Sequence, residues 1–278
     1  MGGTMAAKIT IPDLHRMKQA GTKIVGLVVW DTQMALIAER VGVEIVSVGD
    51  TVGHNLWGQA NPLEVTMDQM VTVAQAVRRG TRRALLSVDF PYGPLQEGVD
   101  RAVRAGIRLV KEAGVDMVKL DGAADFPEAV TALTRAGIPV WAQFGITPQT
   151  ALAHGVDYAS ASKPDAQLPA GLTARMVEEA QRLEAAGAVL LDFTNSGPVA
   201  GPAVVAAVNV PVMGGFGGGP WLDGRVRMAH AAIGYGAKHL DEPIETYANV
   251  AQISLDALTA LAGDIRAGRH IRGQGKKG

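Results

Sequence analysis

Short runs of apolar residues alternate with amphipathic stretches along the whole chain. The runs are nearly continuous and rich in β-branched residues, as expected of parallel strands that are buried on both faces. Seven runs are clear, and a weaker eighth lies near Ile233–His239. The seven are Ile24–Trp30, Val43–Gly49, Ala84–Asp89, Val115–Leu120, Ile138–Phe144, Ala188–Phe193 and Val210–Gly215. This pattern predicts a parallel sheet of eight strands.

Between the runs, apolar residues recur at helical spacing. The predicted helices are Met67–Arg79, Leu95–Ala113, Phe126–Ala136, Ala174–Ala186, Ala200–Ala207, Leu222–Ala232 and Tyr247–Ala262. Glycine just after a helix end readily adopts the left-handed conformation that ends the helix. It occurs at four helix-to-strand junctions, at Gly42, Gly114, Gly137 and Gly187. The repetition indicates a series of βα units.

Eight βα units are compatible with a closed barrel or an open doubly wound sheet. The first βα turn, Trp30-Asp31-Thr32, has none of the glycines of a nucleotide-binding fingerprint, which favours the barrel. We therefore predict an α/β protein with one domain, a (β/α)8 or TIM barrel over residues 1–278. It has a short N-terminal extension (1–10) and a flexible C-terminal tail (268–278). The segment Ala153–Leu172 has no clear period and is a candidate lid.

Composition narrows the class of protein. The chain has 278 residues, of which 47% are hydrophobic, and a formal net charge of −1, so a nucleic-acid or membrane-surface role has no electrostatic support. The absence of cysteine excludes disulfides and thiolate metal sites and fits a reducing compartment. Met1–Lys8 lacks the features of a signal peptide, and no apolar run approaches the ~20 residues of a membrane span. We expect a cytoplasmic protein.

Three carboxylates follow consecutive predicted strands. Asp50, Asp89 and Asp121 stand at the ends of the second, third and fourth strands, where barrels carry their functional groups. Like charges that converge at the barrel mouth need a cation, and oxygen ligands favour Mg²⁺ or a similar divalent ion. An aspartate after a strand also commonly caps the next helix, which is the simpler explanation for a single residue such as Asp31.

Other residues are candidates on weaker grounds. Lys119, within an apolar strand, is expected to face the same space and to neutralise an anionic substrate. His54 lies near Asp50 in a glycine-flanked loop and is within reach of the site. The glycine-rich loop Gly214–Gly219 is either an anion-binding loop or a flexible connection. The remaining histidines have no ligand spacing.

Six short motifs occur in a defined order along the chain. They are Val48–Gly53, Ala76–Gly80, Asp89–Tyr92, Met117–Gly122, Gly145–Gln149 and Leu183–Ala188. Together they resemble the ketopantoate hydroxymethyltransferase (3-methyl-2-oxobutanoate hydroxymethyltransferase) family, from about Thr22 to His239. That family belongs to the phosphoenolpyruvate mutase and isocitrate lyase superfamily, so the resemblance implies a (β/α)8 barrel and a homo-oligomer, usually a decamer.

The resemblance also implies a reaction. The family transfers a hydroxymethyl group from 5,10-methylenetetrahydrofolate to 3-methyl-2-oxobutanoate, giving 2-dehydropantoate for pantothenate biosynthesis. Mg²⁺ is expected at Asp50, Asp89 and Asp121, where it stabilises the enolate of the 2-oxo acid. Thr51, where the family usually has serine, is expected to contact the substrate together with Asp50, Asp89 and Lys119.

Three positions depart from the family pattern. Gln143 replaces the active-site histidine, Asp121 replaces a glutamate ligand, and Thr194 stands at the position of the catalytic glutamate. Threonine is no general base near neutral pH. Asp192, two residues earlier on the same strand face, is the candidate replacement. The candidate catalytic residues are therefore Lys119, Gln143, Asp192 and Thr194.

These departures leave three hypotheses open. The leading one is a Mg²⁺-dependent hydroxymethyltransferase acting on a 2-oxo acid. The second is a folate-independent carbon–carbon lyase or aldolase, and the third is a non-catalytic ligand-binding barrel. The replaced base supports the last two, whereas the retained carboxylates and Lys119 argue against the third.

Overall fold

Eight strands form a nearly closed barrel in the computed structural model, which describes residues 7–147, 149, 152, 170–215, 217–242 and 245–273. The strands are β1 (Ile24–Val28), β2 (Ile45–Val48), β3 (Leu85–Asp89), β4 (Met117–Leu120), β5 (Val140–Gly145), β6 (Leu190–Thr194), β7 (Val212–Met213) and β8 (Gly224–Met228). Neighbouring strands from β1 to β7 pair in parallel, and β8 lies beside β1. Backbone hydrogen bonds join Asp223 to Val212 (2.9 Å) and Val226 to Gly214 (3.3 Å). The predicted (β/α)8 barrel is confirmed.

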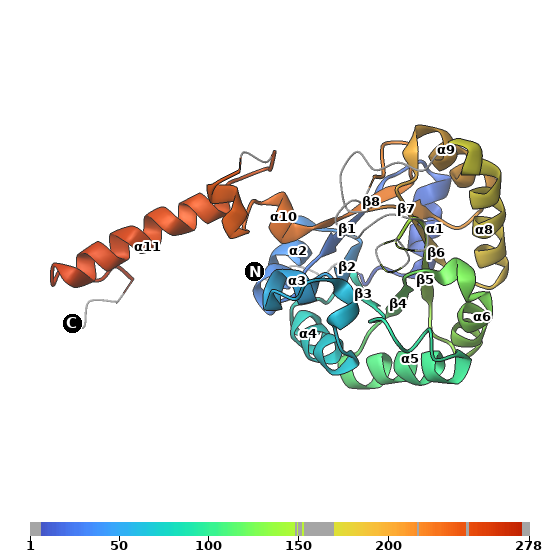
Figure 1. Ribbon diagram of the computed structural model, residues 1–278, viewed down its shortest axis with the longest axis horizontal. Helices are drawn as coiled ribbons and strands as arrows, with labels where there is room; N and C mark the ends of the chain where they lie inside the picture. The colour runs from blue at the N-terminus through green and yellow to red at the C-terminus, as the bar shows by residue number, and fades with distance from the viewer. Residues whose placement is uncertain are drawn as a thin grey trace. The chain divides into compact units, whose positions relative to one another are not determined.

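Helices surround the strands (Figure 1). The barrel helices are α2 (Thr32–Val41), α4 (Met67–Gly80), α5 (Val99–Ala113), α6 (Pro127–Arg135), α8 (Thr173–Ala185) and α9 (Gly197–Ala207). Shorter elements are α1 (Ile11–Gln19), α3 (Val52–Trp57), η1 (Pro62–Glu64), η2 (Ala123–Asp125) and η4 (Ala170–Leu172). All four glycines predicted to follow helix ends adopt positive φ, from 64° to 100°. Of the candidate lid Ala153–Leu172, residues 153–169 lie outside the described residues, and Ala170–Leu172 form η4.

The eighth strand is not where the pattern placed it. It spans Gly224–Met228, within a predicted helix, while the expected strand Ile233–His239 contains a turn and the start of a 3₁₀ helix. The strand alternates, with Val226 buried in the core and Arg225 and Arg227 exposed. Two outward-facing arginines in five residues hide the apolar signature that a strand buried on both faces would show.

The N-terminal end of the barrel is filled by apolar side chains. Leu14 of α1 is fully buried there and packs with Ile24, Leu85, Met117 and Trp141. This end of the barrel is therefore densely packed with apolar side chains. The polar side chains are concentrated at the opposite end, where the strands have their carboxyl ends.

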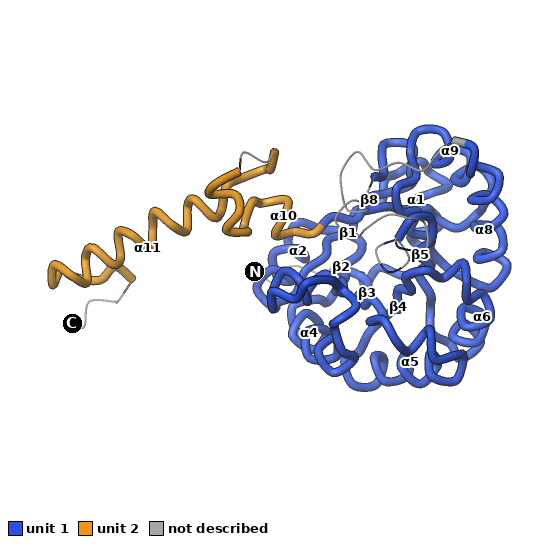
Figure 2. Tube along the Cα trace, in the orientation of Figure 1, with its two compact units in different colours: residues 1–227 blue, residues 228–278 orange. Residues whose placement is uncertain are grey.

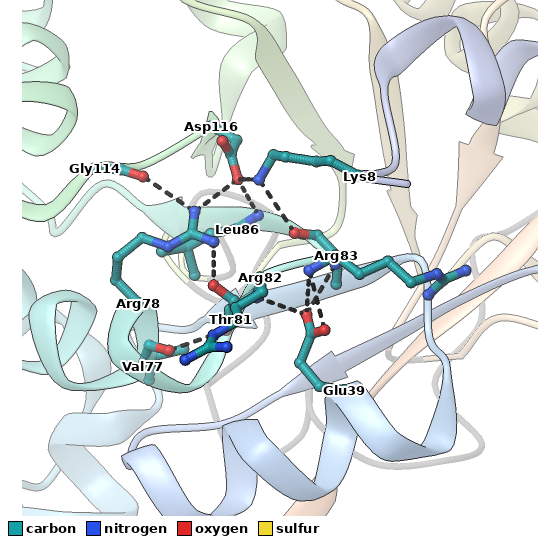
Figure 3. Close-up of polar contacts among 11 residues, drawn as sticks. Lys8, Glu39, Val77, Arg78, Thr81, Arg82, Arg83, Leu86, Gly114 and Asp116 are labelled. Carbon is teal, nitrogen blue, oxygen red and sulfur yellow. Dashed lines mark hydrogen bonds and ion pairs between the residues drawn. The ribbon is translucent and has the colours of Figure 1, made fainter. Parts of the chain in front are cut away.

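A polar cluster braces the chain around the starts of β3 and β4 (Figure 3). Asp116 accepts hydrogen bonds from Lys8 (2.7 Å) and Arg78 (2.9 Å). The Glu39 carboxylate accepts from the backbone N–H groups of residues 82–84, at 2.8 to 3.0 Å. Each carboxylate thereby joins segments that are distant in sequence, which stabilises their arrangement.

The chain divides into two compact units, residues 1–227 and residues 228–278 (Figure 2). The first contains the barrel. The second contains α10 (Ala229–Ala232), η5 (Ala237–Leu240) and α11 (Val250–Arg266). Within the second unit, Asn249 caps α11 by accepting from the Gln252 N–H at 3.0 Å. None of the described helices is both long and apolar enough to cross a membrane.

Candidate active site

Side chains from the ends of five successive strands meet at the carboxyl end of the barrel. Strand pairing places Asp89 of β3 beside Lys119 of β4, and Gln143 of β5 beside Asp192 of β6. Thr194 follows Asp192 by two residues and therefore lies on the same face of its strand. Asp89 and Lys119 were predicted from their positions at strand ends, whereas Gln143, Asp192 and Thr194 were singled out through the family resemblance.

Lys119 is the centre of this group. Its ammonium lies 3.2 Å from Asp192, 3.5 Å from Asp89 and 2.5 Å from the Gln143 side-chain oxygen. The same nitrogen stands 5.5 Å from the centre of the Trp141 ring, which forms the floor below it. An ammonium has three hydrogens, and three acceptors surround it here. Burial disfavours its charged form, but the neighbouring carboxylates, led by Asp89 and Asp192, outweigh burial and hold the pKa of Lys119 above its usual value.

Three largely buried carboxyl groups have pKa values that are raised toward neutral pH. Burial, with repulsion from neighbouring carboxylates, raises the pKa of Asp89 to about 7 and that of Asp50 to about 6. Burial is also the largest cause for Asp121, whose pKa is raised to about 6 while hydrogen bonding from Thr147 opposes the shift. Burial outweighs the opposing charge of Lys119 at all three groups, so a further cation would favour their ionised forms.

Gln149 bridges two of the carboxylates. Its side-chain amide donates to Asp50 at 2.9 Å and to the carbonyl of Phe90 at 3.4 Å, and its backbone N–H donates to Asp121 at 3.2 Å. We did not single out this residue from the sequence as part of the site. The available signal is its place in the motif Gly145–Gln149, which begins at the last residue of β5.

Three carboxylate oxygens of the site are buried and face no protein donor in the described part of the chain. They are Oδ1 of Asp89, Oδ1 of Asp121 and Oδ1 of Asp192. Among the described residues, no group of three or more acidic, histidine or cysteine side chains is close enough to hold a metal ion by itself. Mg²⁺ commonly binds through one or two carboxylates, with water and substrate completing the shell. The unpaired oxygens and the raised pKa values therefore fit an ion held in that way.

Three further residues considered in the sequence, Asp31, His54 and Thr51, differ in how they relate to the site. Asp31 caps α2, accepting from the Met34 N–H at 2.8 Å, as the simpler explanation predicted. His54 is exposed, and its ring contacts the carbonyl of Gln59 at 2.9 Å. Thr51 adjoins the site, because its backbone N–H hydrogen-bonds to Asp50.

The glycine-rich loop after β7 is held by β8. The Arg225 guanidinium donates to the carbonyls of Gly214 (2.9 Å) and Gly215 (3.1 Å). A Cβ on Gly214 would stand 2.9 Å from the backbone oxygen of Phe193, so glycine permits a close approach of the two chains. These contacts explain the glycine at this position through packing.

The site can be compared with known proteins. The family model described as ketopantoate hydroxymethyltransferase matches residues 8–270. The chain belongs to the ketopantoate hydroxymethyltransferase family. Among curated members, 3-methyl-2-oxobutanoate hydroxymethyltransferase of Geobacillus kaustophilus is 31% identical over 260 residues, covering 91% of this chain and 88% of the relative. That of Salinibacter ruber is 33% identical over 259 residues, covering 93% and 95%.

Solved structures outside this family share the fold. The 2,3-dimethylmalate lyase, a PEP mutase/isocitrate lyase superfamily member, has a TM-score of 0.59 at 16% identity, covering 96% of this chain and 90% of its own. Phosphonopyruvate hydrolase, solved in complex with oxalate and Mg²⁺, has a TM-score of 0.57 at 14% identity, covering 93% and 99%. Membership in a ketopantoate hydroxymethyltransferase family makes the chain a transferase of this type.

Proposed function

We propose that this chain transfers a hydroxymethyl group from 5,10-methylenetetrahydrofolate to 3-methyl-2-oxobutanoate or a related 2-oxo acid, giving 2-dehydropantoate or its analogue. The observation that carries the proposal is the buried Lys119, set between Asp89 and Asp192 at the barrel mouth. A buried cation among carboxylates is a site for a charged ligand, because both the charge and its desolvation must be compensated. The proposed substrate, 3-methyl-2-oxobutanoate, is taken from the names of the relatives.

We assign a divalent cation, Mg²⁺ by preference, to Asp50, Asp89 and Asp121. Support comes from the raised pKa values of all three and from the unpaired oxygens of Asp89 and Asp121. Such an ion supplies positive charge for the oxygen of the 2-oxo group when negative charge develops there. Gln149, which now donates to Asp50 and Asp121, would release those oxygens as the ion enters.

The remaining steps, removal of the C3 proton and stabilisation of charge, are assigned to residues of the chain itself. Asp192 has one oxygen paired with Lys119 and the other unpaired and buried, so it is placed to accept the proton from C3 of the oxo acid. Lys119 places a positive charge beside Asp192. Because its pKa is raised, Lys119 stays protonated and cannot itself act as the base. The carbon that loses the proton then bonds to the methylene carbon of the folate, and the two bonds from that carbon to the folate nitrogens break. Water supplies the oxygen of the new hydroxymethyl group, and the nitrogens take up one proton from the water and one that replaces the proton lost from C3. Asp50, Thr51 and Asp89 complete the proposed set of substrate contacts together with Lys119.

The test is product formation by the purified protein. With Mg²⁺, 3-methyl-2-oxobutanoate and 5,10-methylenetetrahydrofolate, we expect a new hydroxymethyl signal in the ¹H NMR spectrum, absent after chelation with EDTA. A folate-independent lyase would instead cleave a branched 2-hydroxy or 2-oxo acid without any folate. Cleavage without transfer would replace this proposal with the lyase hypothesis.

We also propose that the chain forms a homo-oligomer, with a decamer as the state implied by the family resemblance. The second unit supports association. Its helix α11 carries exposed apolar side chains, including Ile253 (62%), Leu258 (62%) and Ile265 (57%). Exposed apolar side chains gathered on one element commonly mark an interaction surface.

A further inference from the structure

We propose that Thr194 is a specificity-determining residue that binds the hydroxyl group of the hydroxymethylated 2-oxo acid. The Thr194 hydroxyl would donate a hydrogen bond to the oxygen of the ligand's hydroxyl group. That ligand hydroxyl would in turn donate a hydrogen bond to Asp192. The inference rests on the proposed function and deepens it, because it names the group by which the enzyme distinguishes the product from its unhydroxylated counterpart.

Lys119 determines which way the Gln143 amide is turned. An ammonium group only donates, so the Gln143 atom 2.5 Å from it is the oxygen. The amide nitrogen therefore faces the other way and donates to Oγ1 of Thr194 at 2.9 Å. With the Gln143 orientation fixed, the Thr194 hydroxyl acts as an acceptor in this contact.

The hydroxyl hydrogen of Thr194 is then available to a ligand. Thr194 is 1% exposed, and within the described part of the chain its side chain makes no further hydrogen bond. A buried donor without an acceptor is costly, so such groups are normally satisfied by a bound molecule or water. We therefore assign this hydrogen to an oxygen atom of the bound ligand.

The backbone around Thr194 is fixed in place. A Cβ on Gly145 would stand 2.5 Å from the Thr194 carbonyl oxygen, so β5 approaches this residue as closely as only glycine allows. Asn195 follows in the left-handed region (φ 58°), and its side-chain amide donates to the carbonyl of Ile146 at 3.2 Å. A position held this firmly suits recognition, because little order has to be gained on binding.

A hydroxyl fits the space better than a second carboxylate. Asp192 Oδ1 is a buried acceptor without a partner, two residues from Thr194 and on the same strand face. Residues two apart on a strand are about 6.6 Å apart, so one oxygen atom can lie within hydrogen-bond reach of both side chains. A hydroxyl is both donor and acceptor and satisfies both groups. A carboxylate would add charge opposite Asp192, and the ammonium of Lys119 is already surrounded by acceptors.

The chemistry places the hydroxyl there as well. In the proposed reaction Asp192 removes the C3 proton, and the hydroxymethyl group becomes bonded to that same carbon. The new hydroxyl is therefore one carbon away from the position where Asp192 acted. This is the region that Asp192 and Thr194 enclose.

The test is calorimetric binding of two acids to the full chain with Mg²⁺ and without folate. The probes are 2-dehydropantoate and 3,3-dimethyl-2-oxobutanoate, which lacks only the hydroxyl and has no C3 proton. We expect the native protein to bind the hydroxylated acid about tenfold more tightly. Thr194→Val should reduce this preference to about twofold and leave the affinity for 3,3-dimethyl-2-oxobutanoate nearly unchanged, whereas Thr194→Ser should keep it.

A second variant tests the direction of the hydrogen bonds. In Gln143→Glu the side chain accepts from Thr194, so the Thr194 hydroxyl hydrogen is used within the protein and the preference should again fall to about twofold. Equal loss of affinity for both acids in Thr194→Val, or no preference in the native protein, would overturn the inference alone. Failure of both acids to bind the native protein would instead count against the proposed function.

Discussion

At the scale of single residues, protonation of the buried carboxyl groups controls the stability of the site. The pKa of Asp89 is raised to about 7, well above the ordinary aspartate value of 3.8, so the folded state holds a proton that the unfolded state has lost. A raised pKa stabilises the fold at low pH, and this contribution disappears as pH rises through the folded-state value. The same direction holds for Asp50 and Asp121.

We therefore expect the metal-free protein to lose free energy of unfolding as pH rises from about 4 to about 7 on account of these groups. Asp89→Asn removes one of them and should flatten the dependence, because asparagine stays neutral throughout. Urea unfolding at several pH values measures both proteins. An Asp89→Asn curve with the slope of the native protein would contradict this assignment.

Lys119 is the buried partner of two carboxylates, and its removal should be costly. Lys119→Met leaves Asp89 and Asp192 without a counter-charge, and we expect a loss of about 3 kcal/mol in the free energy of unfolding at neutral pH. Lys8→Met is the matched control. Lys8 pairs with Asp116 but is 42% exposed, so its loss should cost under about 1 kcal/mol. Equal losses in denaturant unfolding would show that burial does not distinguish the pairs.

The sequence predicted the acidic residues of the site better than the residues that connect them. A carboxylate at a strand end is visible as such, because the barrel brings all strand ends to one mouth. Gln149 was missed because its role depends on how the chain turns back after β5. The link from Lys119 through Gln143 to Thr194 was also out of reach, since side-chain hydrogen bonds between strands depend on register.

At the scale of secondary-structure elements, the glycines that end helices differ in how much space a Cβ atom would have. Gly137 and Gly187 both have positive φ, at 80° and 100°. A Cβ on Gly187 would also stand 2.9 Å from the Thr134 side chain, whereas one on Gly137 meets no atom within 4 Å. We expect Gly137→Ala to cost about 1 kcal/mol and Gly187→Ala about 2 to 3 kcal/mol. Thermal unfolding of the pair tests this, and equal costs would exclude the contribution of packing.

Prediction of the elements succeeded where the apolar signal was continuous. Strands β1 to β7 all coincide with predicted runs, although β5 and β6 extend one residue beyond theirs, to Gly145 and Thr194. The runs are nearly continuous because β2 to β7 are largely buried on both faces, whereas Val25 of β1 is exposed. It failed at β8, where Arg225 and Arg227 are exposed and the alternation over five residues competes with a helical reading. The polar cluster of Glu39 and Asp116 (Figure 3) was invisible for another reason, since it joins residues that are distant in sequence.

At the scale of the whole molecule, the exposed apolar residues of α11 predict self-association. Size-exclusion chromatography with light scattering should give a mass several times that of the 29.0 kDa chain. Leu258→Asp places a charge on this surface and should lower the mass, whereas Thr259→Asp, at an exposed polar position of the same helix, should not. A native protein that elutes as a monomer would contradict the proposed homo-oligomer.

The central claim is that the barrel mouth removes the C3 proton from a metal-bound 2-oxo acid, with Asp192 as the base. The most direct measurement is hydrogen–deuterium exchange at C3 of 3-methyl-2-oxobutanoate, followed by ¹H NMR in D₂O without folate. The control variant is Asp31→Asn, which alters a helix cap. We predict Mg²⁺-dependent exchange by the native protein and by Asp31→Asn, and a loss of at least about 100-fold in Asp192→Asn. Exchange by Asp192→Asn at the native rate, or no exchange by native protein that binds Mg²⁺ and the acid, would contradict the account.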